Sequence, residues 1–173
     1  MILNFRKILL IIFLINLQGC GNYSFTGASI PLGTETFQVN FFENDAGNDF
    51  GSIFEPGLDR DFTSSLQNIL QNQTNLQLVS LDGDLIYEGE IIEYRVSPMT
   101  ATSELTAAQN RLTISVNVRF INVKNEDDDF ENRFSFYYDY PAETQLINIK
   151  SEAHDFIFER LTQDIFNASL AKW

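Results

Sequence analysis

Hydrophobic and polar residues alternate with a period of two along several stretches of the chain, which predicts half-buried strands. The clearest stretch is Leu112–Phe120, where every second residue is apolar and the residues between them are Thr113, Ser115, Asn117 and Arg119. The same alternation predicts further strands over residues 36–42, 76–81, 85–97 and 130–140. Asp82 and Gly83 form a dipeptide typical of a hairpin turn, so strand 85–97 is expected to pair with strand 76–81.

Two stretches change to the period of 3.6 that predicts an amphipathic helix. In the helix predicted over residues 57–72, the apolar positions are Leu58, Phe62, Leu66, Ile69 and Leu70. In the helix predicted over residues 149–171, the apolar positions are Ile149, Ala153, Phe156, Ile157, Leu161, Ile165 and Ala168. The order strand, helix, strands, helix predicts an α+β fold. We expect one domain over residues 36–173: a mixed sheet of four to five strands with both helices packed on one face.

The N-terminus has the pattern of an export signal, which must be set aside before the fold is considered. Arg6 and Lys7 precede the apolar run Ile8–Leu17. That run is too short to cross about 30 Å of hydrocarbon as a helix. It is followed by Leu17-Gln18-Gly19-Cys20, in which an aliphatic residue and a glycine precede a cysteine as in a lipoprotein cleavage site, although Gln18 is larger than usual. Residues 1–19 are therefore expected to be a lipoprotein signal peptide.

Cys20 is the expected site of lipidation. It is the single cysteine of the chain, which leaves no disulfide within one copy. Acyl chains on Cys20 would anchor the protein stably, since each buried methylene contributes about 0.8 kcal/mol. Residues 20–35 are expected to form an extended tether, and Gly21 stands where an acidic residue would favour retention in the inner membrane. The predicted location is the outer membrane, with the domain facing the periplasm.

The charge of the chain excludes one class of partner. The formal net charge is −13, and removal of residues 1–19 takes away two positive charges and no carboxylate, which leaves −15. Nucleic-acid binding needs a basic surface, so no nucleic-acid partner is expected. The 16 Phe and 6 Tyr residues provide enough apolar surface for a folded body.

The residues that could support catalysis or metal binding are few. His154, the single histidine, lies within the second predicted helix, where a structural role is more common than a catalytic one. The acidic run 126–129 lacks the alternating ligand spacing of a calcium loop and fits a solvated turn better. Glu88 and Glu90 share one strand face and resemble paired catalytic acids, but the polar face of an amphipathic strand accounts for them equally well. No catalytic residue, metal site or cofactor is therefore predicted, and the protein is not expected to be an enzyme.

Several segments together resemble the LptE family of lipopolysaccharide-assembly lipoproteins, in a divergent branch. The resembling segments are Cys20-Gly21-x-Tyr23-Ser24-Phe25-Thr26-Gly27-Ala28-Ser29-Ile30-Pro31, Gly83-Asp84-Leu85-x-Tyr87-Glu88-Gly89, Tyr94 through Pro98, Asn110-Arg111-Leu112-Thr113-Ile114-x-Val116, Asp164-Ile165-Phe166-Asn167 and Trp173. The resemblance implies a fold of two helices on a mixed sheet. It also implies residence inside the lumen of an LptD-type β-barrel of the outer membrane, and a part in delivering lipopolysaccharide to the outer leaflet.

An acidic protein that meets a phosphorylated glycolipid is expected to offer local positive charge. Arg111 and Arg119 are an even number of residues apart and should share one face of their strand. With Arg95 they are the candidate lipopolysaccharide-binding residues, although solvated strand faces would also explain them. The alternative function is a solitary lipid- or small-molecule-binding periplasmic lipoprotein, which would need an apolar cavity between sheet and helices.

Overall fold

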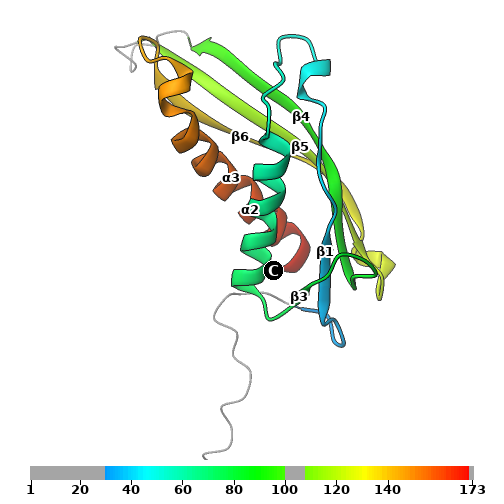
Figure 1. Ribbon diagram of the computed structural model, residues 1–173. Coiled ribbons are helices and arrows are strands. Elements are labelled where there is room, and N and C mark those ends of the chain that lie inside the picture. Colours follow the sequence, from blue (N-terminus) through cyan, green and yellow to red (C-terminus); the bar gives the residue numbers. More distant parts are fainter. Residues whose placement is uncertain (1–29, 100–107, 172–173) are drawn as a thin grey trace, which may run out of the picture.

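A six-stranded mixed sheet, covered on one face by two helices, forms the body of the protein (Figure 1). The computed structural model describes residues 30–99 and 108–171. The elements in chain order are β1 (Thr36–Val39), β2 (Glu43–Asn44), the 3-10 turn η2 (Ala46–Asn48), α2 (Leu58–Gln73), β3 (Gln77–Leu78), β4 (Leu85–Met99), β5 (Gln109–Asn122), the 3-10 turn η3 (Glu126–Asp128), β6 (Phe130–Pro141) and α3 (Leu146–Leu170). The strand order is β3-β1-β4-β5-β6, and β2 also pairs with β4.

Strands β4, β5 and β6 form a long antiparallel meander. Its register places Tyr87 beside Phe120, and Ile114 beside Phe136. A β-bulge between Ile91 and Glu93 interrupts the pairing of β4 with β5. The bulge shifts which positions of β4 face the helices, because one extra residue exchanges the two faces of a strand. Ile91 and Tyr94 are consequently both fully buried, although their spacing is odd.

The predicted hairpin between β3 and β4 is wrong. Strand β1 lies between them and pairs in parallel with both: Phe37 is beside Leu78 on one side and beside Leu85 on the other. The connection that carries Asp82 and Gly83 therefore passes across the start of β1 instead of folding β3 onto β4. Asp82 does adopt a left-handed φ of 56°, so the dipeptide forms a turn, but tertiary pairing with a distant strand decides what the turn joins.

Contacts at the start of β1 fix this connection. Asp84 Oδ2 accepts hydrogen bonds from the backbone N–H groups of Glu35 (2.8 Å) and Thr36 (3.0 Å), while the Asp84 N–H donates to the Thr36 hydroxyl. These bonds, with Lys124 3.0 Å away, hold the pKa of Asp84 well below its usual range. Gly83 lies so close to β1 that a Cβ would be 2.7 Å from the Cβ of Gln38. The crossing therefore requires glycine at this position.

Both helices lie on the same face of the sheet (Figure 1). This is the face on which the buried apolar residues of the meander lie. Helix α2 begins with Asp59 and Asp61 in its first turn, where carboxylates favour the helix dipole, and its buried residues recur every fourth position: Leu58, Phe62, Leu66 and Leu70. Helix α3 buries Ala153, Ile157, Phe158, Leu161, Ile165 and Phe166. Tyr87 crosses the core from the sheet, and its hydroxyl donates to the Ser169 hydroxyl of α3 at 2.9 Å.

The predicted α+β class and the placement of both helices on one face are confirmed, with six strands instead of four to five. The predicted core set of β5 is confirmed as well: Leu112, Ile114, Val116, Val118 and Phe120 are at most 1% exposed. Helix α3 begins at Leu146, three residues before the predicted start. Two of its predicted stripe residues are exposed, Phe156 and Ala168, because Phe158 and Phe166 take the inward positions. The signal peptide 1–19, Cys20 and most of the tether lie outside the described residues.

Candidate functional site

The face of the meander opposite the helices is the candidate functional site. We call it the polar sheet face and define it by the residues that alternate with the core positions of the three strands: Glu88, Glu90, Glu93, Arg95 and Ser97 on β4, Arg111, Thr113, Ser115, Asn117 and Arg119 on β5, and Glu131, Arg133, Ser135, Tyr137 and Asp139 on β6. It carries four arginines and five carboxylates, so it is close to neutral within a strongly acidic protein.

Arg111 is held by its neighbour on β6. Its Nε and one terminal nitrogen donate to the two carboxylate oxygens of Asp139 at 2.7 and 2.8 Å, and its guanidinium carbon is 3.5 Å from the centre of the Tyr137 ring. Bidentate pairing of this kind fixes the guanidinium plane. The bonds to Asp139 raise the pKa of Arg111 above its ordinary value. Two of the five N–H donors of Arg111 are therefore directed at a neighbour within the face.

Glu93 connects all three strands at the centre of the polar sheet face. One carboxylate oxygen accepts hydrogen bonds from Arg133 of β6 and from the Ser115 hydroxyl of β5, both at 2.7 Å, and the other lies 3.0 Å from Arg95 Nε. The Ser135 hydroxyl lies 2.9 Å from the Ser115 hydroxyl and can donate to it, because the Ser115 proton is directed at Glu93. The Glu93 side chain is only 12% exposed, so these charge-assisted bonds lie under a partial cover of protein.

The end of the face beside β2 is more open. Arg119 meets Glu88 at 3.4 Å with a side chain that is 59% exposed, and the Asn117 amide donates to Glu90 at 3.0 Å. A surface cleft of about 450 Å³ lies here, and its lining is mainly polar: Asn40, Phe41, Glu43, Glu88, Gly89, Glu90, Asn117, Arg119 and Glu131. The predicted candidate Arg119 therefore borders a recess that is acidic overall.

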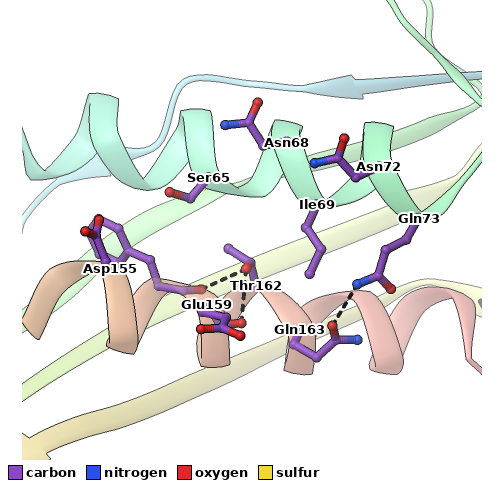
Figure 2. A pocket seen from close by; sticks show the side chains of 10 residues that line it. Ser65, Asn68, Ile69, Asn72, Gln73, Asp155, Glu159, Thr162 and Gln163 are labelled. Atoms are coloured by element: carbon purple, nitrogen blue, oxygen red, sulfur yellow. Dashed lines mark hydrogen bonds between the residues drawn. The ribbon is translucent and has the colours of Figure 1, made fainter. Parts of the chain in front are cut away.

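A second cleft, of about 360 Å³, lies between the two helices (Figure 2). Helix α2 contributes neutral hydrogen-bonding groups, among them Asn68 and Asn72, and carries no charged residue from Thr63 to its end at Gln73. The side-chain amide of Gln73 donates to Oε1 of Gln163 at 2.8 Å. This bond connects the two helices at one end of the cleft. The lining offers polar contacts. The hydroxyl groups of Ser65 and Thr162 donate to backbone oxygens and are not paired with a carboxylate that could act as a general base.

His154 is packed against aromatic side chains. Its ring lies between the rings of Tyr94 and Phe158, with centroids 5.5 and 5.6 Å away, and Nε2 is 3.1 Å from the Tyr94 hydroxyl. Burial lowers the pKa of His154. The acidic run 126–129 forms a turn in which Asp128 and Asp129 accept hydrogen bonds from Asn122. Over the described ranges, no group of three or more His, Cys, Asp or Glu residues is placed to hold a metal ion.

The structure brings Arg95, Arg111 and Arg119 onto one face, as the spacing of the last two predicts, and gives each a carboxylate partner. The sequence interpretation did not identify Glu93 as the central residue, because its place depends on the bulge. The space between sheet and helices is filled by fully buried side chains, of which Tyr87, Tyr94, Phe37, Phe62 and Phe120 are among the largest. No helix in the described part of the chain is long and apolar enough to span a membrane.

Comparisons with known proteins show a family match and solved structures of similar fold. The model of a protein family described as LptE, lipopolysaccharide-assembly, matches residues 34–169. Among solved structures, a minor lipoprotein from Acinetobacter baumannii is similar at 14% identity and a TM-score of 0.50, over 82% of this chain and all of that one. A hypothetical protein from Chlamydia trachomatis is similar at 9% identity and a TM-score of 0.52, over 81% of this chain and all of that one. At these identities the similarity concerns the fold alone. No curated protein matches the chain.

Proposed function

We propose, from the premise that this chain belongs to the LptE lipopolysaccharide-assembly family, that it is a non-enzymatic outer-membrane lipoprotein which plugs and assembles an LptD-type barrel. In that place it assists the passage of lipopolysaccharide to the outer leaflet. The lipid anchor is attached to Cys20, the first residue after a signal peptide that spans residues 1–19. The body 36–173 is then a single domain, tethered by residues 20–35 and facing the periplasm and the lumen.

The observation that carries this proposal is the polar sheet face. A barrel lumen is polar and partly wet, so an occupant can present hydrophilic side chains there without an apolar interface. Across three long strands this face offers hydroxyls, amides and matched charges already paired with one another. A solitary carrier would instead need an apolar cavity, and the corresponding space is filled by the core.

The lipid anchor supports the same conclusion by a separate route. Tethering to the membrane raises the effective concentration of a domain near a membrane-embedded partner. The acidic net charge of the body would favour basic residues on the lumen wall, so the complex should weaken as salt is added.

The three candidate arginines differ in how well they suit a contact with lipopolysaccharide phosphates. Arg111 must exchange a bidentate carboxylate for a phosphate, and Arg95 must leave both Glu93 and Asp49. Arg119 has one long contact at 3.4 Å and the most exposed side chain of the three. We therefore rank Arg119 first for this role.

Depletion in cells combined with site-specific cross-linking tests the proposal. A photoreactive residue at Asn117, on the polar sheet face, should capture an outer-membrane β-barrel protein, whereas the same residue at exposed Asn68, on helix α2, should capture less of it. Depletion should lower the amount of lipopolysaccharide at the cell surface. Normal surface lipopolysaccharide after depletion, with no barrel recovered, would reject the assignment in favour of the solitary carrier.

A further inference from the structure

The meander β4-β5-β6 has two long edges, which the fold treats differently. Along one of them, the side of β4 that faces away from β5 is covered by the segment from β1 to residue 53: β1 and β2 pair with it, and backbone N–H groups of Asn40, Asp45 and Ile53 donate to the backbone oxygens of Tyr87, Ile91 and Tyr94. At the other edge, β6 pairs with β5 alone among the described strands. Its 12 residues leave one side of the backbone without a strand partner.

An uncovered edge of this length is unusual, because unpaired N–H and C=O groups invite pairing with another strand. Proteins protect such edges with short strands, bulges or inward-pointing charges. The pairing of β6 with β5 is regular from Phe130 to Pro141, without a bulge. Its side toward the helices carries aromatic residues that are only partly buried: Phe130, Phe134, Phe136 and Tyr138.

We propose that β6 is a self-association edge, at which two copies of this chain join their sheets by antiparallel pairing about a two-fold axis at Phe136. This inference is independent of the proposed barrel partner. The commitment to a second copy rests on charge complementarity within β6 itself.

The sequence of β6 selects one register. With the axis at Phe136, Arg133 of each copy lies opposite Asp139 of the other, and Ser135 lies opposite Tyr137. Moving the axis to Ser135 places Glu131 opposite Asp139, which is repulsive, and moving it to Tyr137 places Arg133 opposite Pro141. Directly opposite charges of unlike sign stabilise a strand pair, and like charges destabilise it.

The other side of β6 agrees with the same axis. Phe134 would lie opposite Tyr138 of the second copy, and the two Phe136 residues would meet at the axis. Phe156 of α3, which is 43% exposed, lies over the rings of Phe136 and Tyr138 with centroids 5.9 and 5.5 Å away. Pairing would therefore extend an aromatic cluster across the joint, and aromatic cross-strand pairs are favourable.

Disulfide trapping in native membranes tests the register, since Cys20 is the single cysteine and is expected to be blocked by lipid. Two differently tagged full-length copies are co-expressed, one with Ser135→Cys and the other with Tyr137→Cys. Directly opposite residues are about 4.5–5.5 Å apart, within the range of a disulfide. We expect efficient heterodimer trapping by this pair and little when both copies carry Ser135→Cys, a pairing that is two residues out of register and leaves Arg133 and Asp139 in place.

Charge reversal provides the second measurement. Arg133→Asp and Asp139→Arg should each lower trapping on the order of tenfold, because two opposite pairs per dimer become repulsive. The double variant should recover it, although each substitution also breaks a pair within its own copy, with Glu93 or with Arg111. Recovery by the double variant cannot therefore come from better folding. Glu131→Lys, which faces Pro141 of the second copy, serves as the control and should change little.

Three outcomes would overturn the proposal: no heterodimer from the in-register pair, equal trapping by both pairs, or no recovery by the double variant. None of these outcomes bears on the proposed barrel function, which is tested separately by cross-linking from Asn117.

Discussion

The two faces of strands β4 to β6 are formed by alternate residues of the same three strands, yet they are stabilised in different ways. On the helix side, Ile91, Tyr94, Ile114 and Val116 have no exposed surface and are held by apolar packing. On the polar sheet face, Glu93 and its neighbours are held by pairs between charged groups. Apolar burial contributes the larger net free energy, whereas pairs near water contribute little because the separated groups are well solvated. The helix side therefore determines the fold, and the polar sheet face contributes less to it.

The largest expected difference between the faces is in the free energy of unfolding. Ile114→Ala removes a fully buried side chain and should lower that free energy by about 2–5 kcal/mol. The neighbouring Thr113→Ala on the polar sheet face should change it by no more than about 0.5 kcal/mol. Urea unfolding followed by circular dichroism measures both. Equal losses at the two positions would mean that the faces do not divide these roles.

An intermediate effect is expected within the polar sheet face itself. Glu93→Gln removes the charge that holds Arg133 and Arg95, and should cost about 1–3 kcal/mol because the Glu93 side chain is only 12% exposed. Arg119→Ala breaks a pair whose arginine side chain is 59% exposed, and should cost less than about 0.5 kcal/mol. The same unfolding measurement compares them. If Glu93→Gln left the free energy of unfolding unchanged, the central network would add no stability.

The sequence predicted the helix side of β5 correctly because the period-two alternation is local and has no interruption from Leu112 to Phe120. It did not predict the hairpin correctly, since the insertion of β1 between β3 and β4 depends on pairing between residues far apart in the chain. It predicted that Arg111 and Arg119 share a face, which follows from even spacing. Their partners Asp139 and Glu88 lie on the neighbouring strands β6 and β4. Which residues lie opposite each other depends on how these strands align with β5, and the alternation within one strand does not show that alignment.

The β4 bulge shows the same limit. Up to Ile91 the alternation is regular, and beyond it Glu93 turns to the polar sheet face while Tyr94 remains in the core. The apolar positions change from odd to even numbers at Ile91 and Ile92, but both residues are apolar, so the pattern does not show which of them faces inward. The central carboxylate of the polar sheet face therefore became visible only with the register in place.

The smallest predicted effect concerns acid, and it comes from the helix side. Desolvation by burial is the main reason that the pKa of His154 lies below the ordinary 6.5, while Glu55, Asp61 and Asp155 oppose the shift and Lys150 reinforces it. A depressed histidine pKa means that the unfolded chain binds the proton more tightly than the folded one. The stability that neutral His154 contributes is thus fully present above pH 6.5 and falls as the pH drops through that value toward the folded pKa.

His154→Gln should remove this dependence while keeping a polar partner for the Tyr94 hydroxyl, which now lies 3.1 Å from Nε2. The measured quantity is the difference in unfolding free energy between the two proteins from pH 7.5 down to pH 5. We expect it to be constant above pH 6.5 and to move in favour of the variant below it. Glutamates and aspartates that titrate lower are common to both proteins, so their contributions cancel in the difference. A difference that stays flat to pH 5 would mean that His154 is solvated well enough to protonate in the folded protein, and that the apolar side of the sheet is more open there than its packing between Tyr94 and Phe158 implies.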